Sequence, residues 1–74
     1  MENSLKNQIE TIILQILYNE KSVKSTTLLV EKVLEKTFEE KITISEINIK
    51  EIINQMDKEN KIHFTQKEGW RIHI

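Results

Sequence analysis

The fold is decided by residues 48–74, which read NIKEIINQMDKENKIHFTQKEGWRIHI. In the first half of this stretch the apolar residues recur at helical spacing, and they are Ile49, Ile52, Ile53 and Met56. In the second half apolar and polar residues alternate around Ile62 and again around Ile72, which is the period of a β-strand. The stretch therefore predicts a helix followed by two short strands.

The predicted helix has recognisable start and stop signals. Asn48 can cap it, and Glu51 three residues later can complete a capping box. Ile47 and Ile52 occupy the two positions of a hydrophobic staple. The helix should end just before Asn60, which can adopt the left-handed conformation after the last turn.

Residues 62–65 and 70–74 are predicted to form a hairpin across residues 66–69, a segment that ends in the only glycine of the chain. A type I turn followed by a left-handed glycine is a common hairpin connection. This connection predicts two apolar pairs on one face, Phe64 with Ile72 and Ile62 with Ile74. It also predicts that His63 lies opposite His73 on the other face.

Two more helices are predicted upstream. The first spans about residues 5–19 behind Ser4 as N-cap, and its apolar stripe is Leu5, Ile9, Ile12, Ile13, Ile16 and Leu17. The second begins after Ser25, Thr26 and Thr27, any of which can cap it, and its apolar set is Leu29, Val30, Val33, Leu34 and Phe38. Residues 22–24 are too short for a helix and predict a brief strand.

The predicted order is therefore helix, short strand, helix, helix, strand, turn, strand. This is the order of an α+β winged helix, in which a helix-turn-helix core carries a C-terminal β-hairpin wing. We expect residues 1–74 to form one winged-helix domain, and we expect that domain to be the C-terminal fragment of a longer chain.

The amino-acid composition excludes several kinds of functional site. The 74 residues include no Cys, which excludes a disulfide framework, a zinc site of Cys ligands and a thiol nucleophile. No pattern of a nucleophile with its base, of paired catalytic carboxylates or of a glycine-rich phosphate loop is present. We expect a domain that is not an enzyme, holds no cofactor or metal, takes no small-molecule substrate and does not enter a membrane.

Winged helices commonly bind DNA through their third helix, and that use requires a basic surface. The chain has a net charge of −1 and a single Arg, the residue that most often reads guanine. Residues 49–59 carry two Lys against three acidic residues, whereas residues 61–74 carry three basic residues against Glu68. DNA binding by a transcriptional regulator is therefore the alternative interpretation, not the preferred one.

Four aromatic or imidazole side chains, those of Trp70, Tyr18, His63 and His73, are candidates for a functional role. Trp70 shares its strand parity with Ile72, so it is predicted to close the core. Tyr18 could contact a partner, but a partly buried position at a helix end is the favoured prediction. His63 and His73 could hold part of a metal site, but no third ligand is evident, so two exposed strand residues are predicted.

Three stretches carry a resemblance to a known family: IETIILQIL at residues 9–17, LLVEKVL at residues 28–34, and IKEIINQM at residues 49–56 with Ile62. Over nearly all of its length the chain resembles the C-terminal winged-helix domain of the cullins. Tyr18 stands where cullins have the Lys that accepts a ubiquitin-like modifier, and the chain closes on GWRIHI at residues 69–74. In both departures the chain resembles the diverged cullin-like subunit of the anaphase-promoting complex.

The resemblance implies a protein-binding module of a ubiquitin ligase that acts in cell division, in the nucleus and cytoplasm. Its implied partners are the RING subunit of the same ligase and a ubiquitin-conjugating enzyme, which the domain helps to recruit or position. The exposed residues predicted to bind the partner lie on the third helix and the hairpin, and they are Lys50, Asn54, Lys61, His63, Lys67, Arg71 and His73.

Overall fold

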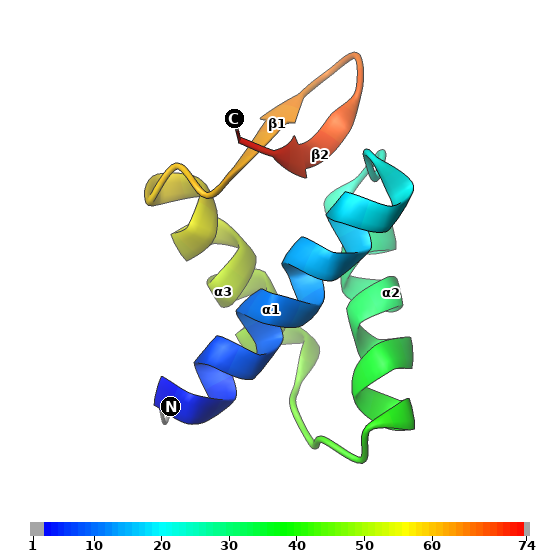
Figure 1. The fold of residues 1–74 in the computed structure, drawn as a ribbon, viewed down its shortest axis with the longest axis vertical. Helices are drawn as coiled ribbons and strands as arrows, with labels where there is room; N and C mark the ends of the chain where they lie inside the picture. The colour runs from blue at the N-terminus through cyan, green and yellow to red at the C-terminus, as the bar shows by residue number, and fades with distance from the viewer. Residues whose placement is uncertain (1–2, 74) are drawn as a thin grey trace.

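Three α-helices and one antiparallel β-hairpin make up residues 3–73, the part of the chain that the computed structural model describes (Figure 1). In chain order the elements are α1 (Asn3–Glu20), α2 (Thr26–Glu39), α3 (Glu46–Lys58), β1 (Ile62–Thr65) and β2 (Gly69–Ile72). The two strands form a single sheet. The domain is therefore α+β, and its layout is consistent with the predicted winged helix.

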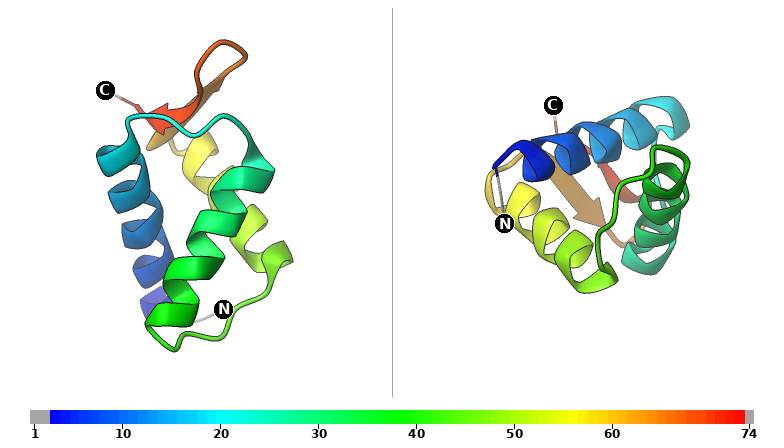
Figure 2. Two further views of the ribbon diagram at one scale, coloured as in Figure 1. Left: turned by 90° about the vertical axis from the view of Figure 1, so that its right-hand side faces the viewer. Right: turned by 90° about the horizontal axis from the view of Figure 1, so that it is seen from below.

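The core lies between the three helices, and the hairpin covers one end of it. Figure 2 shows the helices around a common centre when the domain is seen from below, with the hairpin behind them. The side chains with no exposed surface are Ile9, Ile13, Leu29, Val33, Ile49, Ile53 and Met56. All of them belong to the predicted apolar stripes, which confirms the inner face of each helix. Each such aliphatic side chain contributes about 1.5–3 kcal/mol through burial.

The hairpin is joined to the segment between α1 and α2 by main-chain hydrogen bonds. The Val23 N–H donates to the Trp70 carbonyl at 2.9 Å, and the Trp70 N–H donates to the Val23 carbonyl at 2.7 Å. The brief strand predicted at residues 22–24 is thus confirmed as a single antiparallel bridge. Trp70 is 4% exposed, and its indole Nε1–H donates to the Thr26 hydroxyl at 3.0 Å. Trp70 therefore closes the core, as its strand parity predicts.

Gly69 is required at this junction. Its φ angle of +84° lies in the left-handed region that other residues rarely adopt. A Cβ atom at this position would overlap the Val23 carbonyl oxygen and lie 2.6 Å from the Lys24 Cα atom. The only glycine of the chain therefore permits the close approach of the hairpin to the α1–α2 segment.

Two of the predicted helix starts are wrong. Ser4 lies inside α1, because the helix already includes Asn3. The N-cap of α3 is Ser45, whose extended backbone lets its hydroxyl accept a hydrogen bond from the Asn48 N–H at 3.2 Å. Asn48 is therefore the third residue after the cap, and Ile47 is 71% exposed, so no staple forms.

The other helix-end predictions are confirmed. Ser25 caps α2, where its hydroxyl accepts from the Leu28 N–H at 3.1 Å. Asn60 follows α3 with a φ angle of 62°, which is the predicted left-handed conformation.

The hairpin register differs from the predicted one. The observed pairs are Ile62 with Ile72, His63 with Arg71, Phe64 with Trp70 and Thr65 with Gly69. The turn is one residue shorter than predicted, because Gly69 belongs to β2 and pairs with Thr65. Within the turn the Thr65 hydroxyl accepts a hydrogen bond from the Glu68 N–H at 3.0 Å. The register moves by two residues, so each side chain keeps its predicted face. The predicted partner of Ile62, Ile74, lies outside the described residues.

Two aromatic residues predicted to pack are instead exposed. Phe38 is 76% exposed because Thr37 takes the inward position at the end of α2. The Thr37 hydroxyl donates to the Leu34 carbonyl at 2.9 Å. Tyr18 is 70% exposed because it follows the buried Leu17, and one residue of helix turns a side chain by about 100°. None of the helices in the described range is both long and apolar enough to cross a membrane.

Candidate interaction surface

The seven predicted partner-binding residues are all exposed, but they do not form one site. Lys50 and Asn54 lie on the outer side of α3, one helical turn apart. The other five lie at the start of the hairpin, on its strands or at its tip. The structure therefore divides the predicted set into separate groups, and each group has different surroundings.

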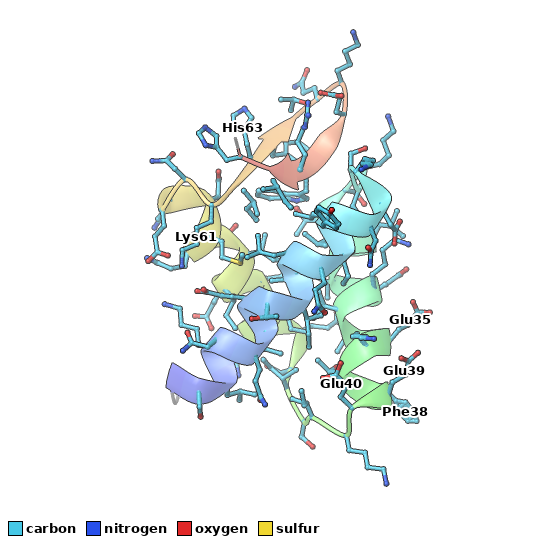
Figure 3. All side chains as sticks on the ribbon, viewed as in Figure 1. Glu35, Phe38, Glu39, Glu40, Lys61 and His63 are labelled. Carbon is cyan, nitrogen blue, oxygen red and sulfur yellow. The ribbon has the colours of Figure 1, made fainter. Side chains whose placement is uncertain are left out.

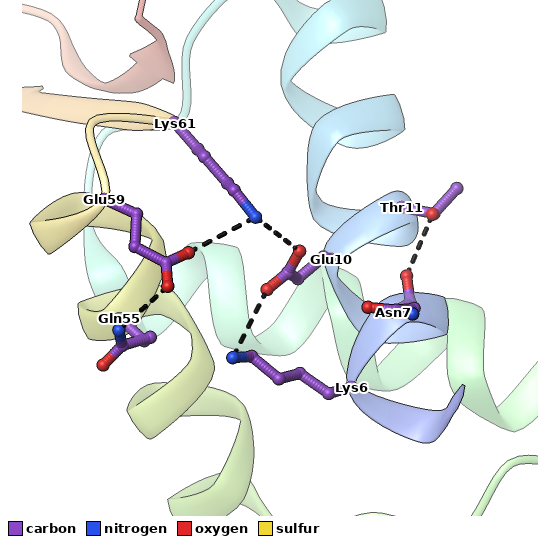
Figure 4. Close-up of polar contacts among 7 residues, drawn as sticks. All are labelled: Lys6, Asn7, Glu10, Thr11, Gln55, Glu59 and Lys61. Carbon is purple, nitrogen blue, oxygen red and sulfur yellow. Dashed lines mark hydrogen bonds and ion pairs between the residues drawn. The ribbon is translucent and has the colours of Figure 1, made fainter. Parts of the chain in front are cut away.

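Lys61 is held by acidic side chains of the domain itself (Figure 4). Its Nζ atom lies 3.0 Å from Glu10 Oε1 on α1 and 3.3 Å from Glu59 Oε1 after α3. Gln55 supports this arrangement by donating to the second carboxylate oxygen of Glu59 at 3.0 Å. Lys61 therefore links α1 to the start of the hairpin, and its charge is balanced within the domain.

The same contacts shift two pKa values. The hydrogen bond from Gln55, followed by that from Lys61, lowers the pKa of Glu59 below its ordinary value. The hydrogen bond to Glu10, followed by that to Glu59, raises the pKa of Lys61. Each group thus favours its charged form in the folded domain.

The outer side of α3 has no excess of positive charge. Between Glu46 and Lys58 the helix has two Lys and three acidic residues, all of them exposed. Lys50 and Asn54 are therefore surrounded by a mixed, slightly acidic surface, which is unfavourable for contact with phosphates.

His63 and His73 lie close together on the outer face of the hairpin, although His63 pairs with Arg71 in the strand register. Their ring centroids are 6.0 Å apart, and the rings meet edge to face. With Thr65 and Arg71 they line a hollow of ≈ 250 Å³. Within the described residues no group of three possible metal ligands is found.

A second hollow lies on the side of α1, and it shares the β2 residue Ile72 with the first hollow. Leu14, Tyr18 and Ile72 line an apolar depression of ≈ 540 Å³ between α1 and β2. A smaller depression of ≈ 210 Å³ lies between Tyr18, Lys21 and Arg71. Ile72 lines all three hollows, so we treat them together as one surface around this residue. We call this the Ile72 surface, and its residues are Leu14, Tyr18, Lys21, His63, Arg71, Ile72 and His73.

The cationic groups of the Ile72 surface are positioned by neighbouring side chains. The Lys21 ammonium lies 5.5 Å from the centroid of the Tyr18 ring, within the range of a cation–π contact. The Arg71 guanidinium lies 2.7 Å from Glu68 Oε1. Lys67 lies outside the Ile72 surface, at the tip of the hairpin, where its main-chain carbonyl accepts from the Lys24 ammonium at 3.1 Å. The surface therefore offers an aromatic and aliphatic centre with cationic and imidazole donors at its margin.

Of the predicted residues, the structure brings His63, Arg71 and His73 together on this surface and leaves Lys50, Asn54, Lys61 and Lys67 outside it. Sequence reasoning missed Leu14, Lys21 and Ile72 and favoured a buried position for Tyr18. One sequence signal was available, because Leu14 falls outside the main apolar stripe of its helix. No protein-family model, curated protein or solved structure matches the chain.

Proposed function

We propose that the chain is a winged helix that binds a protein partner through the Ile72 surface. The observation that carries this proposal is the exposed Tyr18 ring beside Leu14 and Ile72. Protein interfaces concentrate their binding energy in Tyr, Trp and Arg at the centre of an apolar patch with a polar rim. Tyr18 and Arg71 supply two of these residue types, and both line the same depression as Ile72.

The charges of the domain favour a protein over DNA. The outer side of α3, which would enter the major groove, is slightly acidic. Two of the basic side chains of the hairpin region, Lys61 and Arg71, already have carboxylate partners. A DNA phosphate would have to replace those partners, whereas a protein surface can meet them with both charge signs.

The resemblance to the cullins suggests the class of partner. We propose a ubiquitin-conjugating enzyme, held beside the RING subunit of a cullin-like ligase. Lys21, which has no ion pair among the described residues, suits an acidic group at the margin of that enzyme. A patch of this size belongs to the small end of protein interfaces, so binding should be weak and reversible.

An NMR titration tests this proposal. The ¹⁵N-labelled domain is titrated with a panel of unlabelled ubiquitin-conjugating enzymes, and the expected amide shifts lie around Tyr18 and Ile72. Tyr18→Ala should weaken the binding, whereas Ile47→Ala, which removes an equally exposed apolar side chain on α3, should not. Shifts centred on Lys50 and Asn54, or no shifts with any enzyme at high concentration, would refute the proposal.

DNA binding is the second candidate, because residues 61–74 have three basic residues against Glu68. A gel-shift assay with duplex DNA at two salt concentrations tests it, since phosphate contacts weaken steeply as salt increases. A salt-sensitive complex whose NMR shifts lie on α3 and the hairpin would favour this function over the first.

A further inference from the structure

The outer side of α2 has an apolar surface with acidic margins, which lies apart from the Ile72 surface. Leu28 is 38% exposed and Phe38 is 76% exposed, the largest value among the exposed large apolar side chains. Together with Leu34 and charged neighbours they line an open hollow of ≈ 650 Å³. All residues that line this hollow belong to α2, so no other element covers it. We call it the α2 surface, and its residues are Leu28, Glu31, Lys32, Leu34, Glu35 and Phe38.

The spacing of this surface suits a helical ligand. Leu28, Glu31, Glu35 and Phe38 follow one another at intervals of three and four residues, so they lie along one side of α2. At a rise of about 1.5 Å per residue, the two exposed apolar side chains are about 15 Å apart along the helix axis. A second helix lying along α2 could contact both of them with side chains about three turns apart.

The charges of the α2 surface are predominantly negative. The Lys32 Nζ atom lies 3.0 Å from Glu20 Oε2 on α1, so the charge of Lys32 is balanced by this ion pair. Among the described residues, no ion pair involves Glu31 or Glu35. The negative end of the helix dipole adds to this potential at the C-terminus of α2, where Phe38 lies.

More acidic side chains follow at the same end of the helix. Figure 3 shows Glu35, Phe38 and Glu39 extending into solvent at the end of α2 that lies away from the hairpin, whereas Glu40 lies on the side that faces α1. The Lys36 ammonium is 3.9 Å from both Glu39 and Glu40, and Lys41 follows Glu40 in the chain. Near Phe38 the carboxylates without an ion pair among the described residues are therefore those of Glu31 and Glu35.

We propose that the α2 surface binds an amphipathic helical segment of a partner protein, in which large apolar residues are flanked by Lys or Arg. The apolar residues would cover Leu28, Leu34 and Phe38, and the basic residues would pair with Glu31 and Glu35. This binding mode is distinct from that of the Ile72 surface, which has cationic margins and begins at the hairpin. The domain could thus hold two partners of opposite charge at once.

Two synthetic helical peptides with the same Leu and Phe positions serve as probes, one with Lys and the other with Glu on the flanks. In titrations of the ¹⁵N-labelled domain at low salt, the Lys peptide should shift amides between residues 28 and 40. It should bind at least about tenfold more tightly than the Glu peptide, and salt should reduce this difference. Equal binding of the two peptides, or binding of neither, would overturn the proposal.

Matched variants locate the binding. Phe38→Ala and Glu35→Lys should each lower the affinity for the Lys peptide by about tenfold or more, because each removes a central contact. Ile47→Ala and Glu51→Lys make the same kinds of change on α3 and should leave its affinity unchanged. All four positions are exposed, so each variant should retain the parent spectrum outside its own neighbourhood. Equal losses in the α3 variants would contradict the proposal.

Sedimentation of the domain alone tests for a different occupant. The proposal expects a monomer across the concentration range of the titrations. Self-association that Phe38→Ala abolishes would show that a second copy of the chain covers the α2 surface, and the proposal would be wrong. Because the titrations for Tyr18 use a different surface and different ligands, failure of one proposal can be distinguished from failure of the other.

Discussion

The Lys61 Nζ atom lies 3.0 Å from Glu10 Oε1, and this contact joins the start of the hairpin to the middle of α1. The Glu10 side chain is only 12% exposed, whereas the Lys61 side chain is 44% exposed. The ion pair therefore lies at the edge of the core, where it fixes the point at which the chain passes from α3 to β1.

We expect the contacts of Glu59 and Lys61 to make the stability of the domain depend on pH in both acid and alkali. The pKa of Glu59 is lowered, so its contribution is present above its ordinary pKa of 4.5 and is lost as the pH falls through the lowered value. The pKa of Lys61 is raised, so its contribution is present below its ordinary pKa of 10.5 and is lost as the pH rises through the raised value. Urea unfolding followed by circular dichroism should show a plateau at neutral pH between the two losses.

Lys61→Met should remove the alkaline loss that is due to Lys61 and make the acid loss smaller, because Glu59 then keeps only Gln55 as its hydrogen-bond partner. Lys58→Met, a change of the same charge on the exposed side of α3, serves as control. A Lys61→Met protein with the parent pH profile would contradict this assignment.

Gly69→Ala should destabilise the domain by at least about 2 kcal/mol, because it combines a positive φ angle with an overlap onto the Val23 carbonyl. Asn60→Gly is the matched test at another left-handed position, which is exposed. It should change the free energy of unfolding by less than about 0.5 kcal/mol. Thermal unfolding of the two variants checks the difference, and a stable Gly69→Ala protein would mean that the hairpin packs differently.

Ile13→Ala should cost about 2–5 kcal/mol, since Ile13 has no exposed surface. The apolar stripe alone predicts the same range for Ile16→Ala. Ile16 is only partly buried, so we expect the low end of that range, about 2 kcal/mol. Chemical denaturation of both variants tests this order. A larger loss of unfolding free energy for Ile16→Ala than for Ile13→Ala would contradict the observed burial.

Thr26→Val should cost about 1–3 kcal/mol, because it leaves the buried indole N–H of Trp70 without its hydrogen-bond partner. Trp70 is the only Trp, so its fluorescence reports directly on this contact. The parent emission should lie at short wavelength, as expected of a buried indole, and unfolding should move it to longer wavelength. Thr27→Val, at an exposed neighbouring position, should leave stability and emission unchanged.

Much of the fold could be predicted from periodicity. The inner faces of the helices follow from the spacing of residues such as Ile9, Val33 and Ile53, because burial of one stripe is the main reason why these helices form. The start of α3 could not be predicted as well, because Ser45 and Asn48 are both good capping residues three positions apart. Only the extended backbone at Ser45 distinguishes them.

The hairpin register and the candidate site depend on contacts between distant segments. Gly69 pairs with Thr65 because the Val23 segment packs against it, and no local turn preference contains that information. The Ile72 surface likewise requires the end of α1 to lie beside β2, so composition could identify Arg71 as a candidate but not its position near Tyr18. The exposure of Phe38 depends on a difference of one helical position, which periodicity alone does not resolve.

The bridge between Val23 and Trp70 also has a consequence for the order in which the domain folds. The hydrogen bonds within each helix join residues four positions apart, whereas the bond between Thr26 and Trp70 joins residues 44 positions apart. Closing so long a loop is slow and entropically costly, and it comes after local structure has formed. During synthesis, the three helices would therefore expose one open end of their core until Trp70 had left the ribosome. In that interval a chaperone could bind apolar surface that the native domain conceals.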